Sequence, residues 1–177
     1  MVTYFIGFPA PIKAFDRFIP EGFTPVPLNQ RHLTLIYLGS SEDLDKLSEE
    51  AKALPPLPAF KVTFKGLGAF PSLSKPRYLA ALPSKESVKI LERVRDEISD
   101  YIKVSDYIRA HPDKYSVFRP HVSIAYTRMK PTLELRIRVK RAIRAGRSAV
   151  DSIEIREFYL MEAAAGEMKP MLKLRLL

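Results

Sequence analysis

The chain has 177 residues, carries a formal net charge of +9 and contains no cysteine. Its 46% hydrophobic and 28% charged residues are typical of a globular protein, and no apolar run approaches the ~20 residues that a transmembrane helix needs. The lack of cysteine excludes disulfides, thiolate zinc sites and a cysteine nucleophile. We expect one domain over residues 1–177, a monomer in the cytoplasm without membrane contact.

Hydrophobic periodicity and turn residues predict a mixed succession of strands and helices. In chain order we expect strand 2–8, helix 12–18, strand 31–38, helix 41–54, strands 60–67 and 78–82, helix 86–102, strand 121–126, helix 132–145, and strands 152–161 and 169–176. Ser84 is the expected N-cap of the third helix. His111 lies in the polar segment after that helix, and we interpret it as a surface loop residue.

Two of these segments allow more than one interpretation. Residues 132–145 contain both a strand-like alternation and a helical stripe, and Pro131 and Gly146 at the two ends favour a helix. Residues 66–71 are rich in glycine, but no helix follows them. We therefore interpret them as a bend and not as a phosphate-binding loop.

Two short stretches carry nearly the same pattern, a histidine, an apolar residue, a hydroxyl residue and an apolar residue. They are His32-Leu33-Thr34-Leu35 and His121-Val122-Ser123-Ile124, and they hold two of the three histidines of the chain. Because alternate side chains of a strand point the same way, each stretch puts an imidazole and a hydroxyl on one face. Two imidazoles can hold one proton between them and act as general acid and general base, which suits phosphodiester transfer without a metal.

The two halves of the chain repeat one order of elements. Each half has one histidine strand, then a helix, then a pair of strands. We therefore predict an internally duplicated, two-lobed α+β fold, with two antiparallel sheets flanking a central groove and helices packed outside.

Basic residues are concentrated between Lys130 and Arg147, where seven of them stand against the single acid Glu134. This stretch is either a solvated helix face or a track for a phosphate backbone. Asn29 and Gln30 are the only amide residues, and a scarcity of amides and cysteine is typical of proteins from hot environments.

With these paired motifs, the chain resembles the two-histidine (2H) phosphoesterase superfamily. Within it, the chain is most similar to the RNA 2',3'-cyclic phosphodiesterases, formerly called 2'-5' RNA ligases. The resemblance rests on the strand from His32 to Gly39, the Gly-x-Gly-x-Phe-Pro stretch from Gly66 to Pro71, Pro76-Arg77, and Pro120-His121. The chain departs from the relatives at Arg31, where they are frequently apolar, and at Tyr126, where they often have arginine; Arg128 follows two positions on.

The resemblance implies hydrolysis of a 2',3'-cyclic phosphate at an RNA end, tRNA fragments included, to a 2'-phosphate, with no cofactor and no metal. His121 is assigned as the base and His32 as the acid, although the order could be reversed, and Thr34 and Ser123 would bind the phosphate oxygens. The further candidate contacts are Arg77, Arg119, Tyr126 and Phe8, with Phe5 more typical of a core residue. The alternatives are a 2'-5' RNA ligase or 2'-5' phosphodiesterase, and a non-catalytic module that binds RNA ends.

Overall fold

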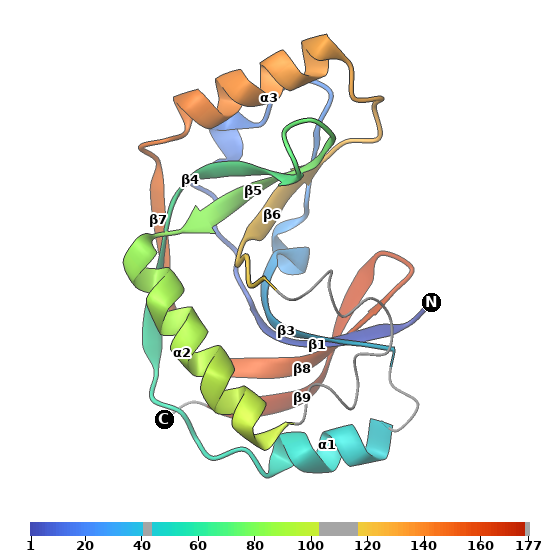
Figure 1. Ribbon diagram of the computed structural model, residues 1–177, viewed down its shortest axis with the longest axis vertical. Coiled ribbons are helices and arrows are strands. Elements are labelled where there is room, and N and C mark those ends of the chain that lie inside the picture. Colours follow the sequence, from blue (N-terminus) through green and yellow to red (C-terminus); the bar gives the residue numbers. More distant parts are fainter. Residues whose placement is uncertain (41–43, 103–116, 176–177) are drawn as a thin grey trace.

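The computed structural model describes residues 1–40, 44–102 and 117–175, which form an α+β fold of antiparallel strands and helices (Figure 1). The strands are β1 (Thr3–Pro9), β2 (Thr24–Pro25), β3 (His32–Gly39), β4 (Phe60–Pro71), β5 (Pro76–Pro83), β6 (Val122–Tyr126), β7 (Val150–Ile155), β8 (Glu157–Ala164) and β9 (Glu167–Arg175). The helices are η1 (Asp16–Phe18), η2 (Leu28–Gln30), α1 (Leu44–Lys52), α2 (Lys85–Tyr101) and α3 (Leu133–Ala145). None of the helices in these ranges is both long and apolar enough to span a membrane.

The strands follow the order β7-β4-β5-β6-β3-β1-β8-β9, with β2 added beside β6. A single residue pair, Leu33 opposite Val122, joins β3 to β6 at the middle of this order. The sheet therefore consists of two antiparallel halves, which are the two sheets that the duplicated pattern predicts.

Each half of the chain contributes a hairpin to the other half of the sheet. The β4–β5 hairpin follows β3 and α1 in the chain, but β5 pairs with β6. The β8–β9 hairpin follows β6 and α3, yet β8 pairs with β1, the neighbour of β3. This exchange ties the two lobes together and brings the two histidine strands to the centre of the molecule.

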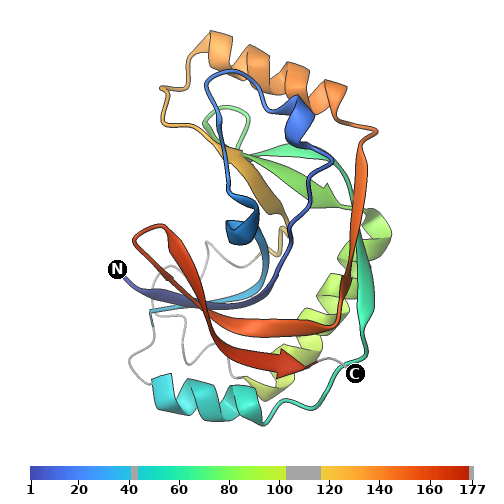
Figure 2. The ribbon, with the colours of Figure 1, turned by 180° about the vertical axis from the view of Figure 1, so that it is seen from behind.

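The helices lie outside the sheet, with α1 and α3 at opposite ends of the molecule and α2 along one side (Figures 1 and 2). Helix α3 packs on β4 and β5, α1 contacts β9, and α2 contacts strands of both halves. Ser84 caps α2 as expected, because its hydroxyl accepts a hydrogen bond from the Ser87 amide at 3.2 Å.

The prediction of one strand over 152–161 is wrong. The segment is divided at Arg156 into β7, which pairs with β4, and β8, which pairs with β1 and β9. The sequence carried a signal of this break, since inward-facing Ile153 and Ile155 occupy odd positions whereas buried Phe158 and Leu160 occupy even ones.

The predicted helix over 12–18 is reduced to the single 3-10 turn of η1. Its first residues bond elsewhere, since the Ile12 carbonyl accepts from Arg31 and the amides of Lys13 and Ala14 donate to Asp151 Oδ2. The expected bend over 66–71 is wrong as well. Strand β4 runs on to Pro71, with an irregularity in its register near Gly66, whose φ is +82°.

Candidate active site

The single pair between β3 and β6 sets the geometry of the two histidine motifs. With Leu33 opposite Val122 in an antiparallel register, His32 lies opposite Ser123 and Thr34 lies opposite His121. Leu33 and Val122 are fully buried on the core side, whereas the four polar residues are half-buried on the other side. We call this second side the histidine face. Each imidazole thus stands beside the hydroxyl residue of the opposite motif.

A hydrogen bond and a ring contact fix the position of the His32 side chain. Its Nδ1 donates to the Gln30 carbonyl at 2.9 Å, and its ring lies 5.0 Å from the ring of Phe5 on β1. The Gln30 side chain in turn accepts from the Met168 amide of β9 at 3.1 Å. The histidine is therefore fixed by three separate elements of its lobe.

His121 has the same arrangement in the other lobe. Its Nδ1 donates to the Arg119 carbonyl at 2.8 Å, and its ring stacks on Phe70 of β4 with the centroids 4.0 Å apart. The guanidinium of Arg119 lies over the same Phe70 ring, 5.2 Å from its centroid. An aromatic ring thus supports each histidine.

These hydrogen bonds assign the tautomer of both histidines. A carbonyl oxygen only accepts, so each Nδ1 must carry a hydrogen, and each Nε2 is left to bind or release the exchangeable proton. A reacting group between the two strands would therefore meet two Nε2 atoms.

The pKa values of both histidines lie below the ordinary value of 6.5. For His32 the cause is burial, which disfavours the imidazolium, opposed by the Gln30 hydrogen bond. For His121 burial again has the largest effect on the pKa, and the positive charges of His32 and Arg119 lower it further. The register of β3 and β6, which puts each histidine beside the other motif's hydroxyl residue, is consistent with this effect of His32 on the pKa of His121.

Arg31 is buried beside His32 and connects several segments. Its guanidinium donates to the carbonyls of Ile12 at 2.6 Å, Val26 at 2.9 Å and Ile124 at 3.4 Å, and to Asp16 Oδ1 at 2.6 Å. The side chain of Arg31 is 1% exposed, whereas that of Asp16 is 41% exposed. The Arg31 guanidinium therefore donates hydrogen bonds to carbonyls that lie near both histidine motifs.

Replacing Arg31 by methionine should lower the free energy of unfolding by about 3 kcal/mol, because buried carbonyls lose their donors. The Asp16→Asn variant should cost less, since the solvent already hydrates that carboxylate. Urea denaturation of both variants measures the difference. Equal losses would show that the ion pair, and not the carbonyl contacts, carries the stabilisation.

The other predicted contacts divide into two groups. Arg119 adjoins His121, and Tyr126 lies on the histidine face at the end of β6. Arg77 is exposed, and strand alternation puts it on the opposite face, with Leu79. The interpretation of Phe8 as a stacking platform is wrong, because Phe8 is 1% exposed and packs in the core.

Sequence reasoning missed the role of two aromatic residues. Phe70 was visible only as part of the Gly66–Pro71 motif, and Phe5 is buried as expected but lies against His32 instead of in the main core. Strand periodicity held the signal for Phe5, because Tyr4, Ile6 and Phe8 form the core face of β1.

A cavity of about 200 Å³ opens beside His32, and Asn29 and Gln30 are among its polar lining residues. Its apolar lining residues are Pro9, Met161, Met168 and Pro170. Within the described residues, no three histidine, aspartate or glutamate side chains gather closely enough to hold a metal ion. His111 lies outside the described residues.

Most of the basic stretch lies in α3, and its cations do not share one face. Arg138 pairs with Glu134 and donates to the Glu21 carbonyl, while Arg136 is half-buried on another side of the helix. Lys140 and Arg144 are exposed. Only the exposed cations of the stretch, such as Lys140 and Arg144, could therefore bind a phosphate backbone.

Three comparisons relate the chain to known proteins. A family model described as the 2'-5' RNA ligase superfamily matches residues 9–162. An RNA 2',3'-cyclic phosphodiesterase of Aeropyrum pernix is 29% identical over 143 residues, which cover 80% of this chain and 77% of the relative. Another, from Thermus thermophilus, is 30% identical over 109 residues, which cover 59% of this chain and 54% of the relative.

Solved structures share the fold. TT0787 of Thermus thermophilus aligns with a TM-score of 0.63 at 19% identity, over 98% of this chain and 97% of that one. E. coli LigT, in a crystal structure with 3'-AMP, also aligns with a TM-score of 0.63, at 20% identity and over 98% and 97% of the two chains.

Proposed function

Because the chain belongs to the 2'-5' RNA ligase superfamily, we propose that it hydrolyses RNA 2',3'-cyclic phosphate ends to 2'-phosphates, with His32 and His121 as a metal-independent acid–base pair. The observation that carries the proposal is the matched geometry of the two motifs. Each histidine has its Nδ1 bound to a carbonyl and stands beside the other motif's hydroxyl residue. The names of the curated relatives agree with this substrate.

In the proposed reaction, His121 Nε2 takes a proton from water, whose oxygen attacks the phosphorus. The bond from phosphorus to the 3' oxygen breaks, and His32 Nε2 gives its proton to that oxygen, which leaves a 2'-phosphate. The positive charge of Arg119 supports His121 as the base, because it lowers the pKa of that histidine further and favours its neutral form.

Thr34 and Ser123 are proposed to donate hydrogen bonds to the nonbridging phosphate oxygens. Among the residues that the structure describes, no hydrogen bond occupies either hydroxyl, so both are available to a substrate. Negative charge on these oxygens grows in the transition state, where positioned donors are most effective.

The test is incubation with a nucleoside 2',3'-cyclic phosphate in excess EDTA, followed by separation of the 2'- and 3'-phosphate products. We expect undiminished turnover and the 2'-phosphate alone. Loss of activity that one specific metal restores would overturn the mechanism. A 3'-phosphate product would mean that the substrate lies the other way round, and binding without turnover would indicate an end-binding module.

Two related activities would use the same histidines, and the substrate that the protein turns over distinguishes them. A 2'-5' phosphodiesterase would cleave a 2'-5'-linked dinucleotide faster than the cyclic phosphate. A 2'-5' RNA ligase would join a cyclic-phosphate end to a 5'-hydroxyl end. Measuring all three rates on one preparation ranks the activities.

The pH dependence of kcat/KM should be bell-shaped with its optimum below pH 6.5. Activity rises as the base loses its proton and falls as the acid loses its own, and the pKa values of both free histidines are lowered. The profile of kcat should lie at higher pH, because the bound phosphate anion favours the imidazolium. Initial rates between pH 4 and 9 provide both profiles. An optimum of kcat/KM above pH 7 would contradict the assignment.

The exposed cations of α3 should affect long RNA only. Exchanging Lys140 and Arg144 for glutamine should weaken binding of a long single strand and flatten its salt dependence, because fewer counterions are released. Filter binding at several salt concentrations measures the slope, with the same exchange at Lys46 and Lys52 of α1 as control. An unchanged slope would mean that this side of α3 is only a solvated surface.

A further inference from the structure

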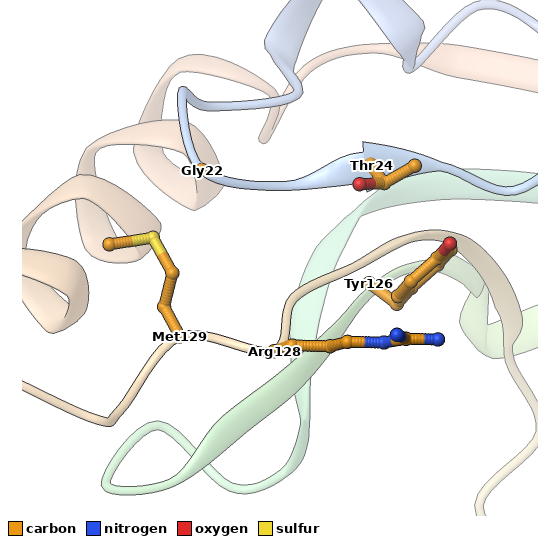
Figure 3. A pocket seen from close by; sticks show the side chains of 5 residues that line it. All are labelled: Gly22, Thr24, Tyr126, Arg128 and Met129. Carbon is orange, nitrogen blue, oxygen red and sulfur yellow. The ribbon is translucent and has the colours of Figure 1, made fainter.

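A second cavity lies at the far end of β6, beyond Ser123. It has a volume of about 540 Å³ and is lined by Gly22, Thr24, Tyr126, Arg128 and Met129 (Figure 3). We propose that this cavity, called here the β6-end pocket, binds the nucleotide on the 5' side of the cyclic-phosphate end. Its base stacks on Tyr126 and its phosphate binds Arg128. The inference rests on the proposed function and extends it to a preference for oligonucleotides.

An irregularity in the pairing of β6 turns Tyr126 onto the histidine face. Ser123 pairs with Ala80 and Tyr126 pairs with Tyr78, so three steps on β6 match two steps on β5. Tyr78 and Ala80 share a face, and Ser123 and Tyr126 therefore share it too. Because Ser123 and Tyr126 lie opposite residues that are two steps apart on β5, at ~3.3 Å per step they are about 7 Å apart, which is about one nucleotide along an extended strand.

The walls of the β6-end pocket are fixed by hydrogen bonds. The buried hydroxyl of Thr127 donates to the Gly22 carbonyl at 2.7 Å and accepts from the Met129 amide at 3.1 Å. Gly22 has a φ of +91°, and a Cβ there would lie 2.5 Å from Met129 Sδ. At this φ a residue other than glycine would be strained, so glycine favours the turn that borders the pocket.

The polar groups of the pocket are free to bind a ligand. Within the part of the chain that the structure describes, no carboxylate pairs with Arg128 and no hydrogen bond occupies the Tyr126 hydroxyl. Figure 3 shows the Arg128 side chain extended beneath Tyr126, with Thr24 on the neighbouring strand. A free guanidinium beside an open aromatic ring suits the phosphate and base of single-stranded RNA.

Positive charge continues beyond the pocket on the same side. The residues just before Gly22, Pro20 and Glu21, line a second hollow of about 400 Å³ together with Arg17, Arg141 and Arg138, the last of which pairs with Glu134. An RNA strand leaving the β6-end pocket would meet these cations next. The direction from Ser123 through Arg128 to Arg141 is therefore electrostatically favourable for a polyanion.

The test compares a nucleoside 2',3'-cyclic phosphate with a dinucleotide that ends in the same cyclic nucleotide. We expect kcat/KM to be at least about 10-fold higher for the dinucleotide, in line with one stacked base. The variants Arg128→Gln and Tyr126→Leu should each bring this ratio toward one, whereas Tyr126→Phe should keep it. Arg93→Gln, the same change at an exposed position of α2, is the control and should leave the ratio as it is.

A ratio near one in the parent protein, or an unchanged ratio in both Arg128→Gln and Tyr126→Leu, would overturn the inference. Absence of turnover on every cyclic substrate would instead overturn the proposed function. In that case calorimetric binding of a dinucleotide with a 3'-phosphate tests the pocket alone. A loss of affinity of about 10-fold in Arg128→Gln would support it, and equal affinity would refute it.

Discussion

Replacing either His32 or His121 by alanine is expected to lower kcat on a cyclic-phosphate substrate by 100-fold or more, while KM changes little. Each imidazole is proposed to move a proton in the transition state, and a positioned acid or base contributes about 10²- to 10⁴-fold. Both rings lie on the histidine face and not in the main core, so the variants should remain folded. Steady-state rates together with urea denaturation measure both effects.

The double variant of His32 and His121 sharpens this test. Groups that act on one proton relay are non-additive, so the double variant should be little slower than the worse single variant. The same exchange at His111, the third histidine, is the control, because the sequence predicts it outside the site. If the two single losses multiplied, the histidines would not act as a pair. A near-normal rate in either single variant would remove that residue from the reaction.

The central geometry of the site could be predicted because it depends on local periodicity. In each motif, alternation alone puts the histidine and the hydroxyl residue on one face of the strand and the two apolar residues on the other face. Leu33 and Val122 are fully buried, as that pattern requires. What joins the motifs is the single pair between β3 and β6. That register depends on the exchange of hairpins between lobes, which no short stretch of sequence encodes.

The parts that could not be predicted depend on long-range contacts. The shortened helix after β1 results from Asp151 and Arg31, which take up its first amides and a carbonyl from distant positions. Tyr126 reaches the histidine face only because β6 has an extra residue relative to β5. Phe8 lies in the core with Ile6, because alternation along β1 puts both on the same face of the strand.

Removal of the Thr34 or Ser123 hydroxyl is expected to have the second largest effect on catalysis. Thr34→Val and Ser123→Ala should each lower kcat by about 100-fold, since each removes one donor to oxygens that gain charge in the transition state. KM should change less, because the cyclic phosphate bears less charge on those oxygens before attack. Single-turnover rates at saturating substrate measure the chemical step directly.

The two motifs supply their own matched controls, since one uses threonine and the other serine. Thr34→Ser and Ser123→Thr retain a hydroxyl at the same branch of the side chain, and both should keep most of the parent rate. A serine or threonine hydroxyl does not titrate between pH 4 and 9, so loss of one donor should not shift the kcat/KM profile on the pH axis. If the valine and serine variants of Thr34 were equally slow, side-chain packing at β3 would be responsible and not hydrogen bonding to phosphate. A loss confined to KM would mean that the hydroxyls bind the ground state and transition state alike.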